Sequence, residues 1–133
     1  MKRSHILLLF MLLLSSCLKK LQTDYYPYGS YRIIKTENLQ IDSNKAIIYG
    51  FLKDMRTNGY VLGQAYVVIQ GTSIGVAADS MGYFKMTIKS GDYIFLTSCI
   101  GYEHVITKKI TILPNTKTEF EMKLDTMRPI ACD

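Results

Sequence analysis

The chain has 133 residues, which is enough for one small domain, and 48% of them are hydrophobic, many in an N-terminal run. Its formal net charge is +5, but Lys2 and Arg3 lie in a segment that we expect to be removed, which leaves +3. The remaining lysines and arginines are scattered along the chain, so the composition argues against a nucleic-acid-binding protein.

The first sixteen residues have the pattern of a secretory signal. Residues 2–3 are basic, residues 6–14 form an unbroken apolar run, and two small serines follow. Nine helical residues rise only about 14 Å, whereas a membrane span needs about 20 residues, so the run is not expected to remain as an anchor. The sequence therefore predicts a cleaved signal peptide at residues 1–16.

The signal ends in Leu14-Ser15-Ser16-Cys17, which resembles the lipobox of bacterial lipoproteins. The resemblance implies cleavage between Ser16 and Cys17 and attachment of a lipid to the Cys17 thiol. Two or three acyl chains hold a domain on a membrane far more firmly than one chain does. The alternative is a plain signal cleavage beside a free or disulfide-bonded cysteine.

Basic residues, Lys19 and Lys20, follow the cysteine. In some Gram-negative lipoproteins an acidic patch at this place directs surface display, and the first acid here is Asp24. We therefore expect an outer-membrane lipoprotein that faces the periplasm.

Residues 17–45 are polar with little periodicity, which predicts a lipid-anchored linker with one short strand near residues 31–35. Aromatic rings in it are suited to stacking on sugars or resting at a membrane interface, but we favour packing against the domain. The tyrosines are Tyr25, Tyr26, Tyr28 and Tyr31, around Pro27 and Gly29.

From residue 46 the chain consists of short β-branched and aromatic runs separated by turn residues. We expect strands at residues 46–53, 64–70, 75–79, 83–89, 92–99, 103–112 and 117–124. Alternation within these runs predicts the core positions Ile48, Gly50, Leu52, Val67, Ile69, Phe84, Met86, Ile88, Phe120, Met122 and Leu124. Seven short strands predict an all-β sandwich over residues 46–124, followed by a C-terminal tail at 125–133.

Motifs in this region occur in the order found in a known family. They are Ile48-Tyr49-Gly50, Asp54, Gly59, Ala65, Val67, Ile69, Gly71-Thr72, Gly75, Asp79-Ser80-Met81-Gly82-Tyr83-Phe84, Gly91, Tyr93 and Ile100-Gly101-Tyr102. The sequence resembles the carboxypeptidase-regulatory-like domain, a transthyretin-type, seven-stranded Greek-key β-sandwich also found at the N-termini of TonB-dependent outer-membrane receptors. The resemblance implies a module that accompanies other proteins. Two loop positions, Ala78 and Tyr60-Val61, depart from the family pattern.

Four residues are interpreted as structural turn residues: Asp79, Gly82, Gly101 and Tyr102, with the Tyr102 hydroxyl fixing a strand corner. A calcium site at Asp79 is the alternative, but a single carboxylate supplies too few oxygen ligands. For Tyr102, the alternative to fixing a strand corner is a role in ligand binding.

The sequence does not predict an enzyme. The mature chain retains a single histidine, His104, so the two-histidine zinc site of a carboxypeptidase cannot form. No nucleophile elbow is visible in the sequence either. We expect no catalytic residue, no metal and no cofactor, and we expect His104 to face solvent.

Two cysteines, Cys99 and Cys132, remain after lipidation of Cys17. In an oxidising periplasm they would form a disulfide that pins the tail to the strand ending at Cys99, or Cys99 would be a buried free thiol. Alternation alone does not decide between the disulfide and the buried free thiol.

The leading functional hypothesis is a membrane-anchored, non-catalytic lipoprotein module that supports or docks on an envelope protein through a sheet edge. The alternative is a lipoprotein that binds a glycan or peptide and is associated with an outer-membrane uptake system. Its distinguishing sign would be several of the ten tyrosine rings exposed on one face. No particular small-molecule ligand is indicated.

Overall fold

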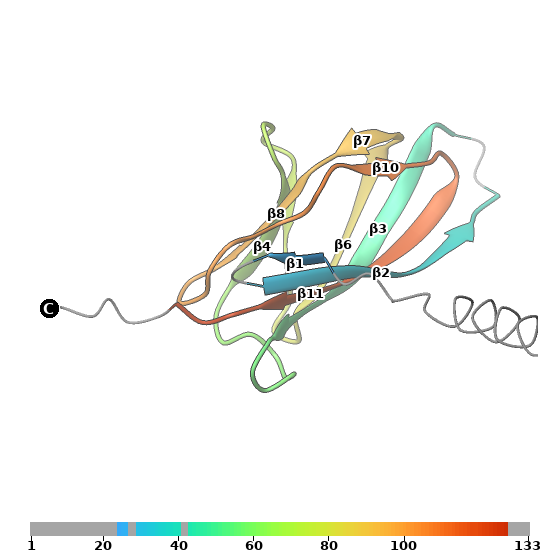
Figure 1. Cartoon of the computed structure of the whole chain (residues 1–133). Helices are drawn as coiled ribbons and strands as arrows, with labels where there is room; N and C mark the ends of the chain where they lie inside the picture. The colour runs from blue at the N-terminus through green and yellow to red at the C-terminus, as the bar shows by residue number, and fades with distance from the viewer. Residues whose placement is uncertain (1–23, 27–28, 41–42, 128–133) are drawn as a thin grey trace, which may run out of the picture.

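The computed structural model describes residues 24–26, 29–40 and 43–127, and every regular element within them is a β-strand. The strands are β1 (Asp24–Tyr26), β2 (Gly29–Asn38), β3 (Lys45–Asp54), β4 (Ala65–Ile69), β5 (Gly75–Ala77), β6 (Tyr83–Lys89), β7 (Gly91–Tyr93), β8 (Phe95–Cys99), β9 (Val105–Ile106), β10 (Ile110–Ile112) and β11 (Thr116–Leu124) (Figure 1). The predicted all-β sandwich is confirmed. The signal peptide, Cys17 and residues 128–133 lie outside the described residues.

Two main sheets face each other across the core. The larger has the order β1-β2-β11-β3-β6 and the smaller has the order β5-β4-β8-β9, while β10 and β7 form a separate pair (Figure 1). Every strand pair is antiparallel except β3 with β11, which is parallel. Parallel neighbours need a long crossover, and the chain between these two strands builds the smaller sheet.

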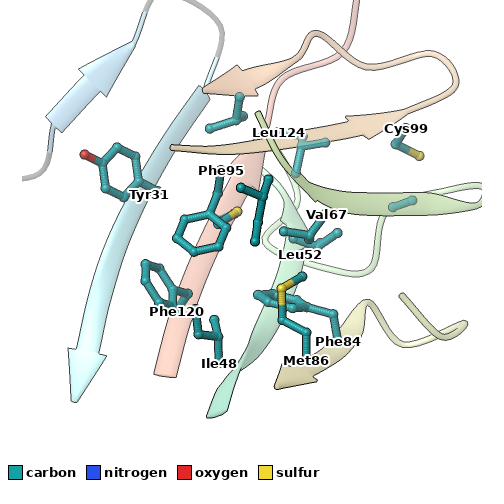
Figure 2. Packing of buried hydrophobic residues seen from close by; sticks show 14 of the residues in the cluster. Tyr31, Ile48, Leu52, Val67, Phe84, Met86, Phe95, Cys99, Phe120 and Leu124 are labelled. Carbon is teal, nitrogen blue, oxygen red and sulfur yellow. The ribbon is translucent and has the colours of Figure 1, made fainter. Parts of the chain in front are cut away.

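The core lies between the sheets and follows the period-two alternation of the strands. Along β11, buried and half-buried residues alternate without interruption. The Phe95 and Phe120 rings, one from each sheet, meet at the centre with their centroids 5.7 Å apart (Figure 2). All eleven core positions expected from the sequence are buried.

The structure extends the short strand expected near residues 31–35 to residues 29–38, so this part of the predicted linker belongs to the domain. These residues form β2, which pairs with β11 from Gly29 opposite Leu124 to Asn38 opposite Thr116. Tyr31 is buried, and its hydroxyl accepts a hydrogen bond from the backbone N–H of Lys108 at 3.0 Å. Residues 32–38 are all exposed, so the strand carries no alternation that the sequence would reveal.

Two predicted strands are each divided. The run 92–99 becomes β7 and β8, which belong to different sheets, and the run 103–112 becomes β9 and β10. At the second break the buried Thr107 hydroxyl accepts a hydrogen bond from Phe95 N at 3.0 Å and donates one to Lys108 O at 2.8 Å. The Thr107 hydroxyl thus takes the place of a backbone carbonyl as the partner of Phe95 N, and the chain leaves the smaller sheet after β9.

Candidate functional site

One end of the sandwich gathers most of the long loops. Leu124 pairs with both Gly29 and Asp54, and in the other sheet Ala65 pairs with Cys99. Glu103 N, after the smaller sheet's β8, donates to Asp125 O, after β11, at 2.9 Å, so these strand ends lie together. We call this the loop end. It comprises residues 55–64, 78–82, 100–104 and 125–127, toward the lower left in Figure 1.

A buried hydrogen-bond cluster holds the loop end together. The Tyr102 hydroxyl donates to Asp54 Oδ2 at 2.8 Å and accepts from Leu62 N at 3.2 Å. Asp54 Oδ1 accepts from the backbone N–H groups of Arg56 and Thr57. The hydrogen bond from Tyr102, with these two, holds the pKa of Asp54 below its ordinary value despite burial. The carboxylate therefore ties the loop after β3 to the corner at Tyr102.

The Asp79–Gly82 turn is also held by hydrogen bonds between an aspartate side chain and backbone N–H groups. Asp79 Oδ1 accepts hydrogen bonds from Met81 N and Tyr83 N, both at 2.9 Å. Gly82 has a φ of +77°, and an added Cβ would overlap the carbonyl oxygen of Leu52. Within the part of the chain that the structure describes, no three His, Cys, Asp or Glu residues are grouped closely enough to hold a metal ion.

Two hollows open at the loop end. One, of about 540 Å³, lies between residues 60–64 and 78–80, and the other, of about 460 Å³, is lined by residues 98–101, Tyr66, His104 and Met127. Gln64 lines both, so they are neighbours.

Cys99 and His104 both line the second hollow, but their arrangement is not that of an activated nucleophile. Burial raises the pKa of the Cys99 thiol, which keeps it protonated, and no hydrogen bond between these two side chains is present. His104 is exposed. Cys132 lies outside the described residues, so its bridge to Cys99 stays a prediction.

The second notable surface is the free side of β2. β1 pairs only with residues 29–31, so among the described residues no strand covers the far side of residues 32–38, which we call the open edge. Ile33 and Ile34 are 47% and 43% exposed there. The register with β11 shifts beside Phe120, which leaves Ile34 as an extra, bulged residue.

Sequence reasoning placed a short strand near residues 31–35 but did not predict that it forms the edge of the larger sheet. The only signal of this edge was the adjacent pair Ile33 and Ile34 within an otherwise polar stretch. The outermost strands of the smaller sheet are β5, with three residues, and β9, with two. Short edge strands offer little backbone for pairing, so the open edge is more accessible than β5 or β9. The larger sheet ends on its other side in β6, a seven-residue strand whose residues alternate between buried and exposed.

A family model of the CarboxypepD_reg-like domain matches residues 48–128, which is more than half of the chain. The chain belongs to the CarboxypepD_reg-like domain family. The family match covers β3 to β11 and begins after β2, although β2 completes the larger sheet. The CarboxypepD_reg-like domain is a regulatory-like, non-catalytic type of module.

Among solved structures, hydroxyquinol 1,2-dioxygenase from Pseudomonas putida DLL-E4 is similar to this chain at 10% identity and a TM-score of 0.49. The match covers 94% of this chain and 77% of the dioxygenase. Similarity at that level carries no inference about chemistry. No curated protein matches the chain. In the described ranges, no helix is long and apolar enough to cross a membrane.

Proposed function

We propose that this chain is a lipid-anchored, non-catalytic module of the bacterial cell envelope whose open edge accepts an extended segment of a protein partner. Membership in the CarboxypepD_reg-like domain family supports an accompanying module. The observation that carries the docking role is the open edge itself, seven exposed residues of a ten-residue strand.

The chemistry of the open edge fits strand addition. A strand that has no neighbour on one side presents backbone N–H and C=O groups there, and an extended peptide can pair with them. Ile33 and Ile34 add apolar contact. Arg32 is paired with Glu121 at 2.9 Å and Lys35 with Glu37 at 3.0 Å, so the edge also carries charges that oppose nonspecific aggregation.

Replacing Ile33 and Ile34 together by lysine is expected to abolish partner capture without unfolding the domain. Both side chains are about half exposed in the folded state, and surface substitutions of this kind change stability by about 0.5 kcal/mol or less. The measurement is cross-linking in intact cells followed by mass spectrometry of the captured species.

The matched control is Ile74→Lys, because Ile74 is 51% exposed and lies in the turn between β4 and β5. This variant should capture the partner as the natural chain does. Unchanged capture by the double variant, with the same species recovered, would remove the open edge as the docking surface.

The anchor is the second part of the proposal, and it rests on the lipobox-like Leu14-Ser15-Ser16-Cys17. Protein extracted from membranes should begin at Cys17 and carry acyl chains, which intact-mass measurement and sequencing of the N-terminal peptide detect. An unmodified N-terminus downstream of residue 16 would make the chain a secreted domain without a lipid anchor.

Binding of a glycan or peptide ligand is the second candidate function. The observation that favours it is that the two hollows adjoin at Gln64 and that each has an exposed tyrosine, Tyr60 at 56% and Tyr66 at 42%. Aromatic faces of this kind stack on sugar rings. Tyr31 and Tyr102, by contrast, are buried.

A further inference from the structure

We infer that the loop end rests on the lipid surface to which the chain is tethered, with five exposed apolar side chains in the headgroup layer. The inference rests on the proposed anchor at Cys17 and adds the orientation of the domain. These side chains, called here the apolar tips, are Tyr60 (56% exposed), Leu62 (81%), Met81 (51%), Ile100 (86%) and Met127 (52%).

The apolar tips are concentrated at one end of the molecule. Twelve large hydrophobic side chains are exposed among the described residues, and five of them belong to the loop end. The opposite end has only Ile74 and Leu113. Leu62 and Ile100 are the most exposed of the twelve. Exposed apolar groups gathered in this way indicate a surface that contacts a membrane or another molecule.

The two most exposed tips are held in place by the structure beneath them. Leu62 N donates to the Tyr102 hydroxyl, which is itself fixed on Asp54. Ile100 precedes Gly101, which has a φ of +86°, and Tyr102 N donates to Cys99 O at 3.1 Å to close the turn. Because the backbone that carries these side chains is already ordered, less conformational entropy is lost when they are buried.

Their distribution favours a lipid surface as the occupant. The five tips come from four separate segments, and Tyr60, Leu62, Ile100 and Met127 stand at the two adjoining hollows, so the apolar groups are spread over the whole end. A deformable headgroup layer contacts separate tips at once. Arg56 is paired with Asp125 at 3.1 Å, and the loop end also contains Asp79 and Glu103, so its formal charge is negative and it is not attracted to anionic lipid. Apolar contact and the anchor would therefore hold this end on the membrane.

The length of the tether also favours this end. Asp24 pairs with Tyr31, two residues from Gly29 at the loop end, which is about 7 Å at the rise of a strand. The seven steps from Cys17 to Asp24 span at most about 24 Å. The opposite end, at Asn38, is seven residues beyond Tyr31, also about 24 Å. β1 runs toward the loop end, so the anchor reaches that end by turning back along β1, with slack, and it reaches the opposite end only when fully extended.

Tryptophan fluorescence tests the orientation, because the natural chain contains no tryptophan. The full mature protein, as Ile100→Trp or as the matched Leu113→Trp at the opposite end, is bound to phosphatidylcholine vesicles with brominated acyl chains. Both positions are exposed, so circular dichroism should show the same fold for each variant. Bromine quenches only tryptophan that enters the lipid, so we expect several-fold stronger quenching in Ile100→Trp than in Leu113→Trp.

Vesicle sedimentation and intact mass separate the two proposals. Acylated protein that sediments with the vesicles but is quenched equally, or not at all, in both variants overturns the orientation and leaves the anchor in place. Unacylated protein that is still quenched selectively in Ile100→Trp overturns the anchor and supports the lipid-facing end. Unacylated protein that neither sediments nor is quenched overturns both.

Discussion

Replacing Gly50 by alanine is expected to prevent the domain from folding. Gly50 pairs with Phe120 in the parallel β3–β11 ladder at the middle of the larger sheet. An added Cβ would overlap the carbonyl oxygen of Phe120 and lie 2.7 Å from its carbonyl carbon. Both atoms are backbone, so the strands must separate to admit the methyl group. We expect a loss above about 4 kcal/mol, most of the stability of a small domain.

Thermal unfolding followed by circular dichroism measures this effect, with Gly71→Ala as the control. Gly71 has a φ of +80° but nothing within 4 Å of an added Cβ, so the control carries only backbone strain of about 1–2 kcal/mol. A Gly50→Ala variant that unfolds at the same temperature as Gly71→Ala would contradict the close parallel pairing of β3 with β11.

A shortened chain that begins at Lys45 is expected to be unfolded or aggregated, although it contains the whole of the family match. It lacks β2, so it loses the burial of Tyr31, about 2 kcal/mol for a side chain of this kind, and the entire antiparallel ladder with β11. Phe120 and Met122 would then lie beside an uncovered edge. An uncovered central strand readily pairs with other copies of the chain.

Circular dichroism and size-exclusion chromatography compare this shortened chain with one that begins at Asp24 and keeps β1 and β2. The longer chain should be folded and elute as a discrete species. A chain beginning at Lys45 that is monomeric and equally stable would show that β2 is dispensable and that residues 29–38 act as the linker expected from the sequence.

The core could be predicted from the sequence because burial follows local alternation. Phe84, Met86 and Ile88 of β6 alternate with exposed residues, and each of the three faces the core. Turn residues could be predicted for a similar reason. Asp79 and Gly82 act on backbone groups within a few residues of themselves, and such local chemistry is visible in the sequence.

The open edge could not be predicted from the sequence. Residues 32–38 are exposed on both faces, so β2 is held chiefly by backbone hydrogen bonds, which every residue except proline can form. The division of the run 103–112 was hidden for a related reason, because Thr107 keeps the alternation while its hydroxyl redirects the backbone.

The sequence by itself determined that the chain is an all-β sandwich, which side chains form its core and where several of its turns lie, because these depend on residues near one another along the chain. Only the tertiary structure decided that β3 and β11 lie parallel, that β2 completes the larger sheet with an open edge, and that Leu62 and Ile100 gather at one end. Those features depend on backbone pairing between distant segments, and backbone groups are nearly identical in every residue.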